Sequence, residues 1–352
     1  MPRMQDAHID RAMTQFSVAM IQDESNFIAD KVFPVIPVSR QSDIYYQYNS
    51  GDFMRDEMKQ RAAYSESVGG DYGVEAQDPY FCRKHAFHKD ISPEEKLNYD
   101  EPLDADKDAV LFVTQKMLIR REMAWSSTFF KSGVWNTDVQ GVSDTPTGTE
   151  ILQWDKTGSD PIGDITKQSV YMASKTGYRP NTLVLSPFVF YALKNHYDIL
   201  DRIKYTEKGI VTTDLLATLF EVDNVYVAWS IVNSAEQGAA DAIDFIYGRN
   251  ALLCYTPKTP ALRQPAAGYI FAWTGLEGAG AYGNRIVRLP MDMLGMGTER
   301  IEGEMAFDLK KISGEMGCFF KDAVSSLTSD ASGDTGSTGS TGSTGTTGGT
   351  GA

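Results

Sequence analysis

The stretch GAGAYG at residues 278–283 is the pattern with the most specific chemical meaning in this chain. It matches GxGxxG, in which glycines let the backbone approach a dinucleotide pyrophosphate and the amides of the following helix face the phosphates. The next residues, NRIVRLPMDM, favour a strand over a helix because they contain β-forming residues and Pro290. We therefore expect a glycine loop here, and the oxidoreductase that the pattern would support is the weakest functional hypothesis.

His85 and His88 are three residues apart, a spacing that would place two metal ligands on one face of a helix. The surrounding YFCRKHAFHKDI (80–91) is rich in β-forming residues, and on a strand the two side chains point to opposite faces. The chain contains no GxSxG, P-loop, HExxH or EF-hand motif. We expect no enzyme, and no catalytic, cofactor or metal site.

Composition limits the class of protein. The chain has 352 residues, 42% of them hydrophobic, which is enough for a large core in one or two subdomains. The net charge is 33 − 47 = −14, which argues against a protein that mainly grips phosphates, although such a chain can lie beside nucleic acid. We expect Cys82, Cys254 and Cys318 to be buried, reduced thiols. Without an apolar run of membrane-spanning length or a signal-peptide core, we expect a soluble protein made in a cytoplasm and no membrane partner.

A charged segment, SGDFMRDEMKQRA at 50–62, separates two β-prone runs, DIYYQY at 43–48 and the run at 80–91. Its charges have both signs and do not sort onto one face of a helix, and turn formers flank it. This pattern predicts a long two-stranded excursion with an irregular tip. Because the tip cannot bury itself in its own core, the pattern indicates contacts with another chain.

The strongest helix signal runs from residue 103 to residue 131. Acidic residues in its first turn suit the positive end of the helix dipole, and Gly133 stops it. The apolar stripe that would pack on a core includes Val110, Val113 and Met117. The residues expected to face solvent are Arg120, Arg121 and Glu122.

The other elements follow from local patterns. Residues 9–33 are expected to be helical, with Ser25 capping a short second helix, and FPVIPV at 33–38 to be extended because its prolines fix φ. Further helices are expected at 161–175, 186–205 and 213–220, strands at 181–186, 225–232, 244–248 and 251–256, a polar loop at 141–160, mainly extended chain at 285–322 and a flexible Gly/Ser/Thr tail at 332–352.

This order of elements resembles the HK97-type fold of tailed-bacteriophage major capsid proteins. Several stretches are also similar to those of phage capsid proteins: FIADKVFPVIPV, SGDFMRDEMKQRA, DADKDAVLFVTQKMLIRREMAW, PNTLVLS, DRIKYTEKGIVTTDLLATLF, FIYGRNALLCY and RIEGEMAFD. The similarity runs from about residue 25 to residue 325. It implies an α+β fold with an N-terminal arm, an extended β-hairpin loop (E-loop), a peripheral (P) domain built on a long spine helix, and an axial (A) domain.

The resemblance implies these boundaries: N-terminal arm 1–40, E-loop region 41–91, P domain 92–159 with spine helix 103–131, A domain 160–284, P-domain return strands 285–327 and flexible tail 328–352. It also implies that two segments contact neighbouring subunits. The candidate inter-subunit residues are Phe53, Arg55, Asp56, Glu57, Lys59 and Arg61 in the E-loop and Phe27, Phe33, Pro34 and Pro37 in the arm. Some relatives cross-link Lys to Asn; Lys59 lies in the loop, but no Asn partner and no catalytic Glu can be matched to positions of this chain.

The function implied by the resemblance is a structural protein that self-assembles into hexamers and pentamers of an icosahedral phage head around double-stranded DNA. The DNA would be a partner by proximity, without sequence specificity. Scaffolding, portal and decoration proteins would be further partners, with a separate scaffolding protein favoured because no long helical prodomain precedes the arm. Location in the virion capsid, after assembly in the host cytoplasm, follows. The alternatives are an encapsulin-like compartment of the same fold and, less favoured, the oxidoreductase.

Overall fold

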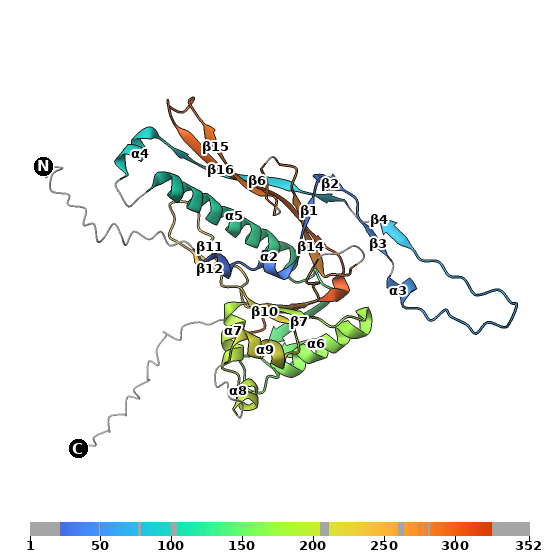
Figure 1. Cartoon of the computed structure of the whole chain (residues 1–352). Coiled ribbons are helices and arrows are strands. Elements are labelled where there is room, and N and C mark those ends of the chain that lie inside the picture. The colour runs from blue at the N-terminus through green and yellow to red at the C-terminus, as the bar shows by residue number, and fades with distance from the viewer. Residues whose placement is uncertain are drawn as a thin grey trace, which may run out of the picture.

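The computed structural model describes residues 22–48, 50–76, 79–99, 104–204, 211–259, 264–276, 278–280 and 282–325. These residues form two lobes and a long projecting loop (Figure 1). The first part of the helix expected at 9–33 and the tail at 332–352 lie outside the described residues.

One lobe is a long sheet covered on one face by helix α5 (Ala105–Phe129). Its strands are β1 (Val35–Val38), β6 (Arg83–Ile91), β14 (Gly268–Trp273), β15 (Asn284–Pro290) and β16 (Glu299–Lys311). The order is β1-β14-β16-β15, with β6 also paired to β16. Strand β1 runs parallel to β14, and the other pairs are antiparallel.

Helix α5 confirms the strongest expectation from the sequence. Asp104 caps it, accepting hydrogen bonds from the backbone amides of Asp106 and Lys107. Val113 and Met117 are buried against β16 at Gly303, where a Cβ atom would lie 2.4 Å from Met117 Sδ. The glycine therefore permits the close approach of helix and sheet, because any larger side chain would collide with the helix.

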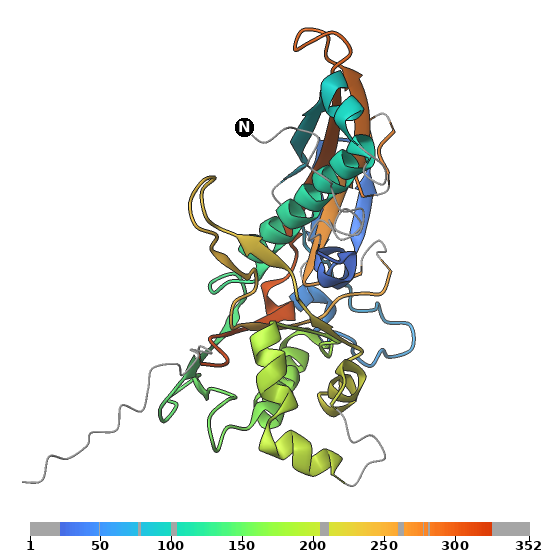
Figure 2. The ribbon, with the colours of Figure 1, turned by 90° about the vertical axis from the view of Figure 1, so that its left-hand side faces the viewer.

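The other lobe packs helices against a second sheet (Figures 1 and 2). The strand order is β10-β9-β13-β17-β7-β8. The strands are β7 (Thr137–Val142), β8 (Ile151–Leu152), β9 (Thr182–Leu185), β10 (Asn224–Val227), β13 (Ala251–Cys254) and β17 (Gly317–Lys321). The helices are α6 (Pro161–Thr176), α7 (Pro187–Lys194), α8 (Tyr197–Ile203) and α9 (Thr213–Leu219).

Helix starts in this lobe agree with their capping signals. Ser186 accepts a hydrogen bond from the Val189 amide and Pro187 follows at the first helical position, as expected for a helix beginning here. The helix expected over 186–205 is in fact two helices, because the chain turns at Asn195 and His196 begins α8 by accepting from the Asp198 amide. All of β9 is buried, as its apolar sequence indicated.

Each of the two large sheets contains strands from segments that were expected, from the sequence, to belong to different domains. Strands β7 and β8, within the expected P domain at 92–159, lie in the second sheet, and β17, within the expected return strands, lies between β13 and β7. Strand β14, within the expected A domain at 160–284, lies in the sheet beneath α5. These differences share one cause. Pairing between segments far apart in sequence decides which sheet a strand joins, whereas the expected boundaries divide the chain into contiguous pieces.

Several local expectations need smaller corrections. Residues 141–160 contain the end of β7 and all of β8 as well as polar loop. Ser25 lies in a short 3-10 helix, η2 (Glu24–Asn26), and the next helix, α2 (Ala29–Val32), has no side-chain cap of its own. The run 225–232 divides into β10 and β11 (Ile231–Asn233), and β11 pairs with β12 (Ile243–Phe245).

Candidate interaction surfaces and the residues that position them

The projecting loop begins and ends in short ladders. Strand β2 (Ser42–Asp43) pairs with β5 (Tyr80–Phe81), and β3 (Tyr46–Tyr48) pairs with β4 (Val74–Ala76). Beyond β3 the chain forms helix α3 (Ser50–Phe53) and then an irregular excursion drawn far from both lobes (Figure 1). Every residue from 53 to 76 is exposed. The two-stranded excursion with an irregular tip, expected from the sequence, is present.

Aromatic contacts hold the base of this loop in a defined shape. The rings of Tyr48, Phe53 and Tyr72 lie with centroids 5.4–6.0 Å apart. Asp52 joins the two limbs because its Oδ2 accepts a hydrogen bond of 2.9 Å from the Gly73 amide, and it also pairs with Arg55 at 3.3 Å. The tip exposes large apolar side chains, with Met58 at 92% and Tyr64 at 104%. The loop is thus a preformed projection with apolar and charged groups that its own chain does not cover.

The six loop residues chosen from the sequence, Phe53, Arg55, Asp56, Glu57, Lys59 and Arg61, are all exposed on this projection. The arm residues behave differently. Phe27 and Phe33 are buried in their own chain, and Phe33 packs edge to face on Phe129 at 4.7 Å. Pro34 is half-buried and Pro37 is exposed on β1. The assignment of Phe27 and Phe33 to a subunit interface is therefore wrong for this conformation, because residues 27–38 complete the first lobe.

A buried carboxylate explains how this N-terminal segment is held. Glu122 on α5 is only 1% exposed, whereas the sequence pattern placed it on the solvent face together with Arg121. Its Oε1 and Oε2 accept hydrogen bonds of 3.0 Å from the backbone amides of Ile28 and Ala29, and Tyr247 donates its hydroxyl to Oε1 at 2.6 Å. Glu122 thus supplies, from another helix, the acceptor that the first amides of α2 lack locally.

Arg121 is also buried and also serves the N-terminal segment. Its guanidinium pairs with Asp30 and donates a hydrogen bond of 3.3 Å to the Tyr282 carbonyl. The helical periodicity did not indicate the burial of Arg121 and Glu122, because a helix of this length contacts different segments on several of its faces. The available signal was a group of three consecutive charged residues, Arg120, Arg121 and Glu122, between apolar stretches of the helix.

The Glu122 carboxyl predicts a pH dependence of stability. Burial is the first cause that raises its pKa above the usual value, against the hydrogen bonds from Tyr247, Ile28 and Ala29 that lower it. A carboxyl with a raised pKa in the folded state stabilises the fold fully below its unfolded pKa, and this contribution is lost as the pH rises through the folded pKa. We expect the unfolding free energy of the wild type, relative to Glu122→Gln, to fall as the pH rises above about 4.5. Urea unfolding of both proteins between pH 4 and pH 8 measures it, and a difference independent of pH would contradict the shift.

A serine–histidine pair in the second lobe is structural. Ser159 Oγ lies 3.0 Å from His196 Nε2, but it donates its proton to the Lys156 carbonyl at 2.7 Å. His196 Nδ1 accepts from the Asp198 amide, which assigns the ring proton to Nε2. The ring therefore donates to the hydroxyl and cannot take its proton, so the pair has the wrong tautomer for a nucleophile and base.

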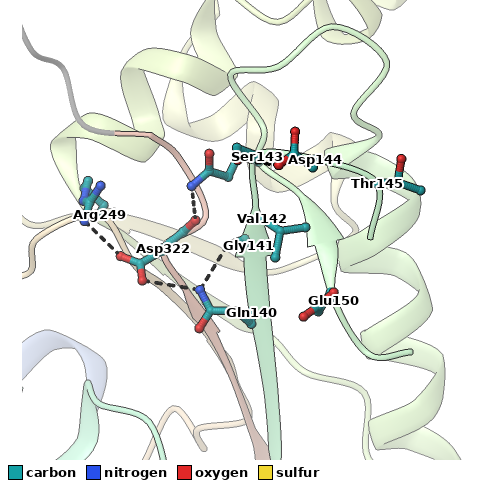
Figure 3. A pocket seen from close by; sticks show the side chains of 10 residues that line it. Gln140, Gly141, Val142, Ser143, Asp144, Thr145, Glu150, Arg249 and Asp322 are labelled. Carbon is teal, nitrogen blue, oxygen red and sulfur yellow. Dashed lines mark hydrogen bonds and ion pairs between the residues drawn. The ribbon is translucent and has the colours of Figure 1, made fainter. Parts of the chain in front are cut away.

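A shallow pocket lies where β7, β8 and the end of β17 meet (Figure 3). Arg249 pairs with Asp322 at 3.2 Å, and the Gln140 amide donates to the Gly141 carbonyl and to the Asp322 carboxylate. Glu150 on the rim accepts from the Thr147 hydroxyl and amide. The charged groups at the centre of the pocket thus satisfy each other and tie strand ends together, and they form no convergent site for a ligand.

The glycine motif and the two neighbouring histidines singled out in the sequence lie in or beside ordinary strands. GAGAYG is followed directly by strand β15, so the glycine loop is confirmed and the helix that a dinucleotide would need is replaced by a strand. His85 and His88 lie on strand β6, as expected.

The three cysteines are buried. In the described ranges, no three His, Cys, Asp or Glu side chains are grouped to hold a metal ion. None of the helices described is both long and apolar enough to cross a bilayer.

A second exposed apolar surface was missed by the sequence pattern. The turn between β15 and β16 presents Met293, Leu294 and Met296, which are 98%, 59% and 91% exposed. The turn extends from one end of the long sheet (Figure 2). Its signal in the sequence is three large apolar residues within a glycine-containing turn, a place where polar residues are usual.

No protein-family model matches this chain. Two curated relatives are major capsid proteins: that of Burkholderia phage BcepMu, 27% identical over 270 residues that cover 74% of this chain and 82% of the relative, and that of Pseudomonas phage JBD67, 26% identical over 337 residues that cover 90% and 98%. This chain is a homologue of phage major capsid proteins.

The capsid homologue has the HK97-type fold, as the sequence indicated. A crystal structure of a phage-related protein from Bordetella bronchiseptica matches it with a TM-score of 0.64 and 22% identity, covering 86% of this chain and 94% of that one. The capsid structure of cyanophage P-SCSP1u matches with a TM-score of 0.52 and 10% identity, covering 83% and 86%.

Proposed function

We propose that this chain is the structural subunit of an icosahedral phage head, and that its copies assemble as hexamers and pentamers around double-stranded DNA. The observation that carries the proposal is the projecting loop, in which residues 53–76 are all exposed although they include large apolar side chains. A monomer gains nothing from this surface, whereas a shell buries it between copies. The homology to phage major capsid proteins supports the same function.

In this proposal the lobe built on α5 is the P domain, with α5 as spine helix, and the lobe with the second sheet is the A domain. Phe53, Arg55, Asp56, Glu57, Lys59 and Arg61 then contact a neighbouring subunit, together with the exposed Pro37. The methionine-rich turn between β15 and β16 is a second contact with another copy. The charges of the loop set the specificity and rate of association more than its strength, because most of them are solvated.

The proposed role is structural and not enzymatic. The chain would act in the virion capsid after assembly in the host cytoplasm, with scaffolding, portal and decoration proteins as partners. Its overall charge of −14 suits DNA that is enclosed without sequence-specific contact, because no strong attraction to phosphates hinders packaging or release.

Deletion of residues 52–66 tests the assembly role. We expect the truncated protein to fold, since these residues lie outside the three hydrophobic clusters of the described residues, but to form no closed shells. Negative-stain microscopy measures shells, and far-UV circular dichroism and thermal unfolding serve as the controls for folding. Closed shells of normal size from the truncated protein would refute the role of the loop.

Wild-type particles separate the capsid from an encapsulin-like compartment of the same fold. The ratio of absorbance at 260 nm to that at 280 nm in purified particles distinguishes the contents. DNA-filled shells support the phage head, protein-filled shells support the compartment, and small oligomers without a shell would contradict both.

A further inference from the structure

Strand β15 is an edge of the first sheet, at the end of the lobe that carries the methionine-rich turn (Figure 1). It pairs with β16 on one side, and among the described residues no strand pairs with its other side. Its exposed residues are Asn284, Ile286, Arg288, Leu289 and Pro290. A strand edge with free backbone groups is a template for pairing with another strand.

Hydrogen bonds at the two ends of β15 show which backbone groups face outward. The Ala306 amide donates to the Gly283 carbonyl, and the Met291 amide donates to the Thr298 carbonyl, so residues 283 and 291 face β16. Along an antiparallel strand, residues that bond to one neighbour alternate with residues that point away from it. The odd-numbered residues of β15 therefore bond to β16, and the even-numbered residues direct their amides and carbonyls outward.

The outward groups form an uneven set. The Asn284 carbonyl already accepts a hydrogen bond of 3.0 Å from the Gly280 amide, and Pro290 has no amide hydrogen to donate. Within the described part of the chain, no hydrogen bond uses the outward amides and carbonyls of Ile286 and Arg288. The edge thus offers the amides of residues 284, 286 and 288 and the carbonyls of residues 286, 288 and 290.

This set is complementary to itself in one antiparallel register. When Val287 faces Val287 of a second copy, Ile286 faces Arg288, and each such pair exchanges two hydrogen bonds. Asn284 then faces Pro290 and donates to its carbonyl. The bond that the proline cannot donate would go to the Asn284 carbonyl, which already has a donor in its own chain.

The two neighbouring registers fit less well. If Arg288 faces itself, the Ile286 carbonyl lies opposite Pro290 and has no donor. If Ile286 faces itself, the Arg288 amide lies opposite the Asn284 carbonyl, which the Gly280 amide already occupies. Because a buried backbone group without a partner costs free energy, the register centred on Val287 is favoured.

The side chains agree with the same register. Ile286 and Leu289 are 44% and 40% exposed, and they would lie opposite Arg288 and Arg285 of the second copy. Both arginines are paired with carboxylates of their own chain, so their aliphatic stems can cover the two apolar side chains without a new unpaired charge. At the centre, the half-buried Val287 would meet its own copy, and β-branched residues pack well in such pairs.

The register also brings a partner to the methionine-rich turn. Beyond Pro290 the turn of the second copy continues alongside the segment that precedes Asn284, in which Tyr282 is 47% exposed. Met293 and Met296, at 98% and 91% exposed, thereby approach an aromatic ring, and contacts between methionine sulfur and aromatic rings are favourable.

We propose that β15 pairs with β15 of a second copy about a two-fold axis through Val287. Neighbours within a ring of five or six subunits contact each other through two different surfaces, whereas a two-fold contact uses the same surface twice. The pairing therefore joins subunits of different rings. It rests on the shell function proposed above and adds the surface that connects hexamers and pentamers to one another.

Val287→Cys tests the axis. Facing residues that are not hydrogen bonded have Cα atoms about 4.5 Å apart, within the range of a disulfide. Assembled Val287→Cys protein is treated with oxidised glutathione, which accepts the two electrons released by the thiols. We expect a disulfide-linked dimer on a non-reducing gel, and none from the wild type, because its native thiols are at most 2% exposed.

Leu289→Cys is the matched control for the register. In the proposed pairing this position faces residue 285 and lies four residues along the strand from its own copy, too far for a disulfide. We expect it to give less than about a tenth of the dimer formed by Val287→Cys. No dimer from assembled Val287→Cys protein, or an equal yield from Leu289→Cys, would overturn the proposal.

Ile286→Pro tests whether the pairing is used in assembly. The Ile286 amide points away from β16, so proline removes a donor of the proposed contact and none of the hydrogen bonds to β16. We expect closed shells to require a protein concentration at least about tenfold higher, because each two-fold contact loses two hydrogen bonds, while free rings still form. Ile286→Val keeps the amide and should assemble as the wild type does. Negative-stain microscopy and sedimentation measure shells and rings, and thermal unfolding checks the fold.

Normal shells from folded Ile286→Pro protein would overturn the proposal. Impaired assembly of Ile286→Pro without a Val287→Cys dimer would assign the edge to a strand of another protein, which also overturns it. Wild-type shells are the reference in both experiments. A failure of this contact is therefore distinct from a failure of the capsid function, in which the wild type would form no shells.

Discussion

Glu122→Ala should lower the free energy of unfolding by about 3–5 kcal/mol, since the methyl group leaves the backbone amides of Ile28 and Ala29 and the Tyr247 hydroxyl buried without an acceptor. Each unsatisfied buried donor costs roughly 1–3 kcal/mol. The loss should be concentrated in the N-terminal segment, because Glu122 joins that segment to α5. Urea unfolding followed by circular dichroism measures the change, and hydrogen exchange at residues 27–38 locates it.

Two variants make the Glu122 result specific. Glu122→Gln keeps the shape and one acceptor oxygen, so it should cost less than Glu122→Ala. Arg120→Ala, two residues away on the same helix and exposed, should change stability by no more than about 0.5 kcal/mol. An unfolding midpoint of Glu122→Ala equal to that of the wild type would show that the carboxylate does not hold the segment.

Met117→Asp is the second large effect that we expect. Met117 is 8% exposed and lies against Gly303 of β16, in the space where a larger residue on the strand would have its Cβ atom. A carboxylate there loses its hydration, Arg121 one turn further on is already paired with Asp30, and the volume of the methionine is lost as well. We expect a cost of about 3–5 kcal/mol, seen as insoluble or partly unfolded protein.

Controls separate burial at this position from a general effect on the helix. Met117→Leu conserves volume and should cost less than about 1.5 kcal/mol. Lys116→Asp, on the exposed neighbouring residue, should leave the free energy of unfolding nearly unchanged. Soluble Met117→Asp protein with normal stability would contradict the packing of α5 on β16.

The burial of Met117 can be predicted from the sequence, whereas the burial of Glu122 cannot. The burial of Met117 follows from the periodicity of α5, because apolar residues at three- and four-residue spacing line one face of a helix. The burial of Glu122 does not follow, because it depends on residues 28, 29 and 247, which reach α5 only in the folded chain. Periodicity assigns a polar residue to solvent unless a distant segment covers it.

The sequence by itself determined the elements whose causes are local. Ser186 and Pro187 indicated the start of α7, and the apolar run of β9 indicated a buried strand. The charges of residues 50–62, which have both signs and do not lie on one face of a helix, indicated a projection outside the core. The β-forming residues after GAGAYG indicated a strand for the same kind of reason. In each case the deciding interactions lie within a few residues along the chain.

Only the tertiary structure decided which sheet each strand joins and which surfaces remain open. Strand β17 enters the second sheet beside β7, and β14 enters the first sheet beside β1, because backbone pairing is satisfied between segments far apart in sequence. Phe33 is buried for the same reason, since β1 pairs with β14 and brings its ring onto Phe129. Among the described residues, nothing covers Met293 and Met296 in the turn between β15 and β16, and this too appears only in the folded chain.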